Sequence, residues 1–179
     1  MENRSYILYL LLLLIFLSLA LIILLANQNQ NIAQLLNQQK PLKAGEKAFT
    51  FAVTSITGEL INIKGKRTLL FFFSRDCPGC TKFIPKLEEH IQEKHLEKKY
   101  LVGISVDSEN ATKKLIVEQD FSFPIIVDHN FQIARKYHIH FVPSLVLISD
   151  VGTIDYFQHP EEKVVDAFDK ILSIIKTAN

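Results

Sequence analysis

The stretch LLFFFSRDCPGCTK, residues 69–82, determines the fold and the chemistry expected of this 179-residue chain. Its first five residues, Leu69–Phe73, are apolar without a break, which is typical of a strand buried on both faces of a sheet. Beyond it, apolar side chains recur at helical spacing at Phe83, Ile84, Leu87 and Ile91. The turn between this strand and this helix holds both cysteines of the chain, Cys77 and Cys80, in C-x-x-C spacing.

This placement gives the two cysteines distinct chemical roles. Cys77 falls at the cap of the predicted helix, where unpaired backbone N–H groups and the helix dipole lower a thiol pKa from about 8.5 to roughly 3.5–7.5. Pro78 suits the first helical position because its missing N–H costs no hydrogen bond there. Arg75 adds positive potential near Cys77, and Asp76 subtracts some of it. Cys80 lies one turn inward, so we expect Cys77 to be the attacking thiol and Cys80 the resolving thiol of a redox-active, catalytic pair.

Three other interpretations of the cysteines are less consistent with the sequence. A zinc site usually needs a second cysteine pair or two suitably spaced histidines, and the chain has no second pair. A purely structural disulfide between Cys77 and Cys80 would close a four-residue loop and restrict the unfolded chain little. Two inert buried thiols are the third alternative. We therefore predict redox chemistry, with no metal and no cofactor.

Composition narrows the class of protein further. The formal net charge is +1, and no basic stripe points to a nucleic-acid partner. Two cysteines are too few for a small secreted scaffold held together by disulfides.

An apolar N-terminal segment predicts a membrane anchor. Residues 6–26 carry no charge and would span about 31 Å as a helix, enough to cross a bilayer. The run is longer than the apolar core of a signal peptide, and Leu24-Leu25-Ala26 matches an A-x-A cleavage site poorly. We therefore predict an uncleaved anchor, with a cleaved signal peptide and a buried core helix as the alternatives.

The flanks of this segment indicate its orientation. Arg4 lies on the N-terminal side, whereas the other side carries no charge until Lys40. The positive-inside tendency then favours a cytoplasmic N-terminus at residues 1–5 and an exported domain at residues 46–179. Residues 27–45 between them are rich in Asn and Gln and are predicted to be a polar tether, with a helical extension of the anchor as the alternative.

The remaining sequence alternates strand and helix patterns. A hairpin is predicted within Phe49–Ile63, around Thr57-Gly58. Further strands are expected at Tyr100–Val106, Pro124–Val127, Val142–Ile148 and Ile154–Phe157, and helices at Ser108–Glu118, Phe131–Tyr137 and from Val164 onward. This order predicts an α/β sandwich with a mixed central sheet.

Several of these motifs together resemble one family. They are FFFSRDCPGC, the segment Ser105–Asp128 ending in FPIIVD, and IHFVPSLVLI at residues 139–148. With them the sequence resembles the thioredoxin-fold, membrane-tethered TlpA/ResA-like thiol–disulfide oxidoreductases of the redoxin superfamily, over about residues 44–176. The resemblance implies a thioredoxin-like sandwich with an N-terminal β-hairpin and an α/β insertion.

The resemblance also implies a substrate-binding loop at Val142 and Pro143. In the family the bond before this proline is cis and lies beside the C-x-x-C, and an X–Pro bond is the one linkage where cis costs only about 0.5–1 kcal/mol. The backbone of Val142 would then pair with an extended substrate segment by strand addition. A trans proline that merely starts an edge strand is the alternative.

Three positions depart from the family pattern. Asp76 stands where an aromatic residue commonly precedes the first cysteine. Phe71 and Phe83 stand where thioredoxin and the ResA-like proteins, respectively, carry an acid. The sequence therefore identifies no buried proton acceptor for Cys80, and water, His138 or His140 are the alternatives.

The resemblance implies thiol–disulfide exchange at a bacterial cytoplasmic (inner) membrane, with the catalytic domain on the periplasmic or extracellular side. The expected partners are an exported cysteine-containing protein, such as apocytochrome c in cytochrome c maturation, and a transmembrane electron donor. We expect the pair to act as a reductant, with an oxidant role left open.

Two other functions remain as alternatives. One is a peroxiredoxin-like peroxidase, because Ser74 and Cys77 match part of that family's pattern, although Leu70 stands where its proline belongs. The other is a Sco-like copper chaperone using Cys77, Cys80 and either His138 or His140.

Overall fold

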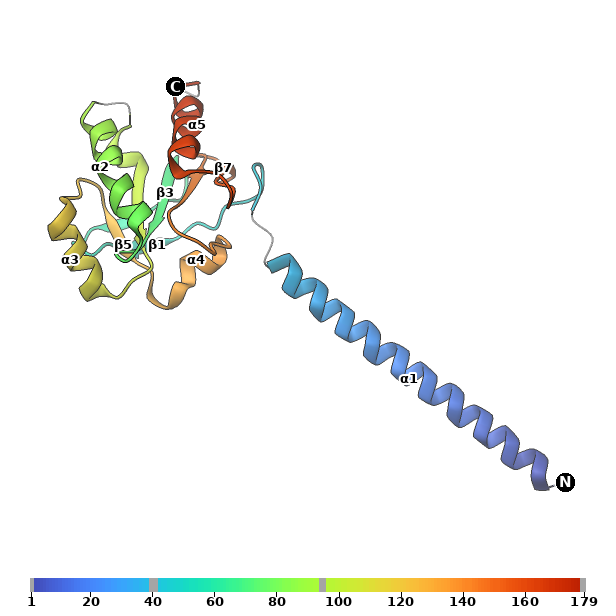
Figure 1. Ribbon diagram of the computed structural model, residues 1–179. Helices are drawn as coiled ribbons and strands as arrows, with labels where there is room; N and C mark the ends of the chain where they lie inside the picture. Colours follow the sequence, from blue (N-terminus) through green and yellow to red (C-terminus); the bar gives the residue numbers. More distant parts are fainter. Residues whose placement is uncertain (1, 39–41, 94–95, 178–179) are drawn as a thin grey trace. The chain divides into compact units, whose positions relative to one another are not determined.

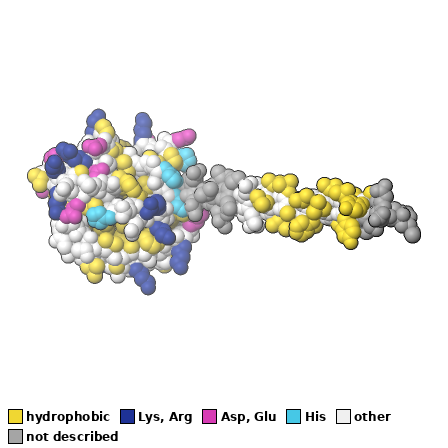
Figure 2. Space-filling view, turned by 90° about the horizontal axis from the view of Figure 1, so that it is seen from below, with side chains coloured by type: hydrophobic (Ala, Val, Ile, Leu, Met, Phe, Trp, Pro, Cys, Tyr) yellow, Lys and Arg dark blue, Asp and Glu magenta, His cyan; other side chains and the backbone are white. Residues whose placement is uncertain are grey.

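The computed structural model describes residues 2–38, 42–93 and 96–177. Its first helix, α1 (Glu2–Gln38), forms a compact unit separate from the rest of the chain. Within α1 the stretch Tyr9–Gln30 is long and apolar enough to cross a membrane, and none of it is buried. Hydrophobic side chains cover much of the middle of this helix, whereas charges of both signs are scattered over the visible face of the domain (Figure 2). The segment predicted as a polar tether is thus helical as far as Gln38, while the predicted domain boundaries stay predictions.

The second unit is an α/β domain with two sheets (Figure 1). The N-terminal hairpin consists of β1 (Ala52–Thr54) and β2 (Leu60–Asn62). The main sheet has the order β5-β4-β3-β6-β7, with strands β3 (Thr68–Phe73), β4 (Leu101–Ser105), β5 (Ile125–Val127), β6 (Ser144–Ile148) and β7 (Ile154–Phe157). The helices are α2 (Pro78–Gln92), α3 (Glu109–Gln119), α4 (Gln132–Lys136) and α5 (Val164–Thr177), with short 3₁₀ turns at Lys98–Tyr100 and His129–Phe131.

Strand β3 lies at the centre of the sheet because its side chains are apolar on both faces. Residues 69–73 are all fully buried. Leu69, Phe71 and Phe73 face one hydrophobic core, whereas Leu70 and Phe72 face another. The alternation follows from the two-residue period of a strand, and it explains why the apolar run has no polar interruption.

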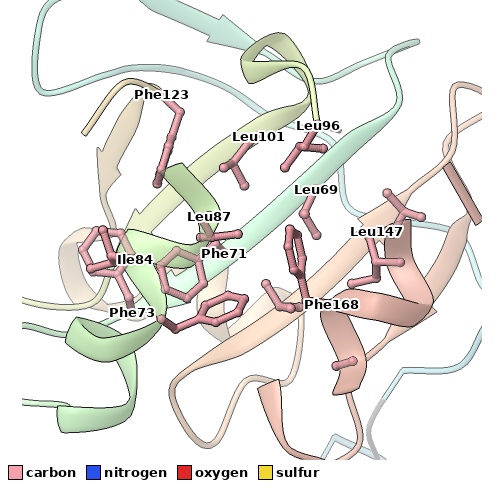
Figure 3. Close-up of a cluster of buried hydrophobic side chains, with 14 of the residues drawn as sticks. Leu69, Phe71, Phe73, Ile84, Leu87, Leu96, Leu101, Phe123, Leu147 and Phe168 are labelled. Carbon is pink, nitrogen blue, oxygen red and sulfur yellow. The ribbon is translucent and has the colours of Figure 1, made fainter. Parts of the chain in front are cut away.

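The first core lies between the sheet and helices α2 and α5 (Figure 3). Phe71 packs edge-on against Phe83 of α2, with ring centroids 5.6 Å apart, and Phe83 packs edge-on against Phe168 of α5 at 5.4 Å. These contacts fix the start of α2 against the sheet, and so position the cysteines.

The second core, on the opposite face, is covered by the hairpin and α4. Tyr137, which follows α4, is fully buried, and its hydroxyl donates a hydrogen bond to the carbonyl of Phe49.

The chain also forms backbone hydrogen bonds with both edge strands of the main sheet, β5 and β7. Ile56 donates from its backbone to Ile125 of β5 at 2.8 Å, and Gly45 donates to Ile154 of β7 at 2.8 Å. Part of each edge strand is thereby paired within the chain.

The strand directions decide where the functional residues meet. Strands β3, β4 and β5 are parallel, so their carboxyl ends lie at the same end of the sheet. Strand β6 is antiparallel to β3, so its first residue, Ser144, lies at the same end of the sheet as the last residues of β3. The topology therefore brings the residues after β3, the residues after β4 and the residues before β6 together. The predicted mixed sheet and hairpin are confirmed, with strand and helix ends within about two residues of those expected.

Candidate active site

The two cysteines lie where the chain leaves β3 and enters α2. Cys77 is the N-cap residue, with extended backbone angles, and Pro78 occupies the first turn of the helix, as the sequence predicted. The N–H of Cys80 donates to Cys77 Sγ at 3.1 Å. An N–H aimed at this sulfur stabilises negative charge on it, which is the physical basis for a low thiol pKa at a helix start.

Cys77 and Cys80 form a disulfide with Cα atoms 5.3 Å apart. Cys80 is fully buried within the first core, whereas Cys77 is half-buried and in contact with the edge of that core. Only the sulfur of Cys77 is therefore placed for another molecule to reach. This difference in access is consistent with an attacking Cys77 and a resolving Cys80.

The loop before β6 forms one wall of the site. The peptide bond between Val142 and Pro143 is cis, as the resemblance implied. The carbonyl oxygen of Val142 lies 3.5 Å from Cys77 Sγ. Both Val142 and Pro143 are half-buried, so part of each remains open to solvent beside the disulfide. Residues 65 positions apart thus form one site.

The turn before Cys77 is held by a residue that the sequence reasoning missed. Asp107, just after β4, accepts hydrogen bonds from Ser74 Oγ at 2.8 Å and from the backbone N–H of Arg75 at 2.5 Å. One signal was available: an Asp that directly follows a parallel strand lies at the same sheet edge as the end of its neighbour.

The charges around Cys77 are arranged differently from the expectation for Arg75. Its guanidinium Nη2 pairs with Glu118 Oε1 of α3 at 3.0 Å, and this hydrogen bond raises the pKa of Arg75. The positive charge is therefore largely compensated by Glu118, rather than directed at Cys77 alone. Asp76 is exposed next to Cys77, and its N–H donates to Ser74 Oγ at 3.2 Å.

The surroundings of Cys80 are apolar. Phe71 and Phe83 occupy the two positions where the family pattern has acids, and both are buried in the first core. His138 is half-buried and His140 is exposed, both in the segment that leads to Val142. Among residues 2–38, 42–93 and 96–177, no three His, Cys, Asp or Glu side chains are grouped so that they could hold a metal ion.

The comparison with protein families assigns the chain. The model of the AhpC/TSA family matches residues 44–157. The chain belongs to the AhpC/TSA family.

Named relatives narrow the assignment within the AhpC/TSA family. The thiol-disulfide oxidoreductase ResA of Halalkalibacterium halodurans is 28% identical over 116 residues, covering 63% of this chain and 66% of that protein. The sporulation thiol-disulfide oxidoreductase A of Bacillus subtilis is 27% identical over 111 residues, covering 59% of this chain and 67% of that protein. The matched parts thus span about two thirds of each relative. These names confirm the predicted enzyme class, protein thiol–disulfide oxidoreductase.

Solved structures confirm the fold. The thioredoxin domain of a thiol-disulfide oxidoreductase from Bacteroides vulgatus superposes with a TM-score of 0.61 at 22% identity, over 74% of this chain and 98% of that one. StoA of Bacillus subtilis gives a TM-score of 0.59 at 23% identity, over 70% of this chain and 95% of that one. The AhpC/TSA domain of this chain therefore has the thioredoxin-like fold that the resemblance implied.

Proposed function

We propose that this protein is a membrane-tethered thiol–disulfide oxidoreductase in which Cys77 and Cys80 exchange electrons with cysteine-containing exported proteins. The observation that supports it most directly is the Cys77–Cys80 disulfide at the start of α2, with one sulfur accessible and the other fully buried. Named relatives of the same enzyme class support it independently.

The exchange takes place in two balanced steps. In the reduced protein the Cys77 thiolate attacks one sulfur of a substrate disulfide, so a mixed disulfide forms and the other substrate sulfur leaves as a thiolate. The Cys80 thiol then loses its proton and attacks Cys77 Sγ, which releases the second substrate thiol. The substrate gains two electrons and two protons, and the protein is left as the Cys77–Cys80 disulfide. A dithiol donor must reduce it again before another turnover.

The wall formed by Val142 and Pro143 is proposed to bind the substrate. Both residues are partly exposed beside Cys77, and the carbonyl of Val142 is close to its sulfur. An extended segment next to the substrate cysteine would add to this loop by backbone hydrogen bonds, as in other strand-addition complexes. Sequence preference would then be weak, because backbone groups are common to all substrates.

The anchor and its orientation complete the proposal. The apolar stretch Tyr9–Gln30 fits a single-pass membrane helix. The cation on its N-terminal flank, Arg4, supports a cytoplasmic N-terminus and a catalytic domain on the periplasmic or extracellular side. There a transmembrane electron donor would keep the pair reduced. Apocytochrome c, the client that the ResA resemblance implies, is the first client to test.

The redox equilibrium of Cys77 and Cys80 tests this function directly. The full chain in detergent is equilibrated against a series of glutathione or dithiothreitol buffers, and the disulfide fraction is measured by thiol alkylation. A reversible couple near or below about −220 mV supports a reductant, and a value near −120 mV makes the protein an oxidant. The absence of any reversible couple would disprove the proposal.

A trapping experiment identifies the client and the attacking sulfur. Cys80→Ser leaves Cys77 unable to be resolved, so mixed disulfides with cell-envelope proteins are expected to accumulate and to disappear on reduction. Cys77→Ser is the matched control and is expected to trap nothing. Equal trapping by both variants would contradict the assignment of Cys77 as the attacking thiol.

A further inference from the structure

The turn between β3 and Cys77 is fixed by a single carboxylate from the neighbouring strand end. Asp107 uses both oxygens: Oδ1 accepts from the Ser74 hydroxyl at 2.8 Å, and Oδ2 accepts from the Arg75 N–H at 2.5 Å. Hydrogen bonds to an ionised carboxylate are stronger than those between neutral groups. Asp107 is half-buried, which reduces the competition of water for these bonds.

Ser74 links Asp107 to the attacking cysteine through hydrogen bonds. Its hydroxyl donates to Asp107 and accepts from the N–H of Asp76 at 3.2 Å. Its carbonyl accepts from the N–H of Cys77 at 3.3 Å. One serine therefore restrains the two residues that follow the turn, and Cys77 is one of them.

Asp107 is itself anchored from the side of α3. Its N–H donates to Ser105 Oγ at 3.3 Å, and Ser105 Oγ shares a hydrogen bond of 2.7 Å with the buried hydroxyl of Thr112. A second link joins the turn to α3, where Arg75 pairs with Glu118 at 3.0 Å. A continuous set of hydrogen bonds thus runs from α3 through Asp107 and Ser74 to Cys77.

The position of Cys77 matters because its thiolate depends on a directed hydrogen bond. Cys77 has an extended backbone rather than a helical one, and the Cys80 N–H reaches its sulfur at 3.1 Å. Hydrogen bonds weaken steeply with poor alignment, so a small rotation of Cys77 would remove this stabilisation. We propose that Ser74 and Asp107 are positioning residues that hold Cys77 where the Cys80 N–H meets its sulfur. This inference rests on the proposed function of Cys77 as the attacking thiol.

The variant Ser74→Ala tests the proposal without changing the charge of the site. It is made in the full chain in detergent, which is then reduced, and the Cys77 thiol pKa is measured from the pH dependence of alkylation. We expect a higher pKa, and a rate constant per thiolate toward 2-hydroxyethyl disulfide lower by on the order of ten-fold, as small misplacements of reacting groups cost. Ser74→Thr keeps a hydroxyl and is expected to restore both values.

A matched control separates positioning from stability. Ser149 is a buried serine, whereas Ser74 is half-buried, and the Ser149 hydroxyl likewise takes part in a turn, where it accepts from the N–H of Thr153 at 3.0 Å between β6 and β7. Ser149→Ala is expected to lose a similar amount of stability in urea unfolding while it leaves the Cys77 pKa and rate unchanged. If Ser74→Ala behaves like Ser149→Ala in all three measurements, Ser74 has only a structural role and the proposal is overturned.

A double-mutant cycle tests whether Ser74 and Asp107 act as one unit. Asp107→Asn alone, Ser74→Ala alone and the double variant are compared by the rate constant per thiolate. We expect the double variant to react no more slowly than the slower single variant, because residues in one network are not additive. Fully multiplicative losses would overturn the joint role. If the reduced wild-type protein does not react with 2-hydroxyethyl disulfide, the proposed function is overturned instead. The measured Cys77 pKa would then still decide whether Ser74 positions this thiol.

Discussion

Gly79 and Pro143 approach each other so closely that a Cβ atom on Gly79 would lie 3.3 Å from Cδ of Pro143 and 3.9 Å from Cys77 Sγ. Gly79, the second of the two residues between the cysteines, therefore lies against the proposed substrate-binding loop. Gly79→Ala is expected to push this loop aside, because the added methyl group meets a ring rather than a flexible chain end. Reaction with a protein disulfide should slow by on the order of ten-fold, within the range that small misplacements cost.

The stability of Gly79→Ala should change little, since alanine favours a helix by about 1 kcal/mol over glycine and offsets the tight contact. The measurements are stopped-flow reduction of a protein disulfide and urea unfolding of the full chain. Lys82→Ala, an exposed change on the same helix, is the control and should alter neither. An unchanged rate for Gly79→Ala would mean that the substrate does not use the Pro143 loop.

Asp76 predicts a preference for positively charged substrates. Its carboxylate is exposed beside Cys77, and the nearby Arg75 is already paired with Glu118. The ratio of rate constants for cationic cystamine and neutral 2-hydroxyethyl disulfide should fall in Asp76→Asn, by about three- to ten-fold at low salt. Taking the ratio cancels any change in the Cys77 pKa. Asp169→Asn, an exposed change on α5, is the control, and equal ratios in both variants would contradict the prediction.

Replacement of Gly103 is expected to destabilise the protein, because no side chain fits at the centre of β4. A Cβ atom there would lie 3.0 Å from ring atoms of both Phe73 and Phe123. Gly103→Ala should lower the free energy of unfolding by about 1–3 kcal/mol, as overpacked cores do. Urea unfolding measures it, with Val117→Ala, an exposed change on α3, expected to cost less than about 0.5 kcal/mol. A neutral Gly103→Ala would show that the phenylalanine rings repack easily.

Glu162 is expected to contribute to the loss of stability of the domain at acidic pH. Burial opposes its charge, but hydrogen bonds from Lys170 and Tyr156 prevail and lower the pKa of this carboxyl. A lowered folded-state pKa contributes stability that is present above the unfolded value of about 4.3 and is lost as the pH falls through the folded value. Glu162→Gln should therefore lower stability at pH 7 by about 0.5–1 kcal/mol, since it removes the ion pair with Lys170, whose ammonium is exposed to solvent.

The same variant should lose less stability than the wild type between pH 5 and 3, which urea unfolding across this range can follow. Glu161→Gln, the exposed neighbour, is the matched control and should follow the wild-type curve. Parallel pH curves for the wild type and Glu162→Gln would contradict the role given to this carboxyl.

The sequence by itself determined the features that depend on neighbouring residues. The run Leu69–Phe73 predicted a central strand because such a strand is apolar on both faces, and the C-x-x-C with Pro78 predicted the start of a helix because capping is a local effect. The same reasoning gave Cys77 as the accessible cysteine and Cys80 as the shielded one. The uncharged run at residues 6–26 predicted a helix long enough for a membrane, although not that the helix continues to Gln38.

Only the tertiary structure decided which distant residues complete the site. Asp107 holds the turn at Ser74 across 33 positions, and Arg75 pairs with Glu118 across 43. Hydrophobic periodicity shows which face of an element is buried, but it does not give the order of strands in a sheet, and that order places the ends of β3, β4 and β6 together. Phe71 and Phe83, at the two positions where the family pattern has acids, lie in the first core together with Cys80 and pack edge-on against each other. Their contact joins a strand to a helix, so it depends on how these elements pack and does not follow from local periodicity.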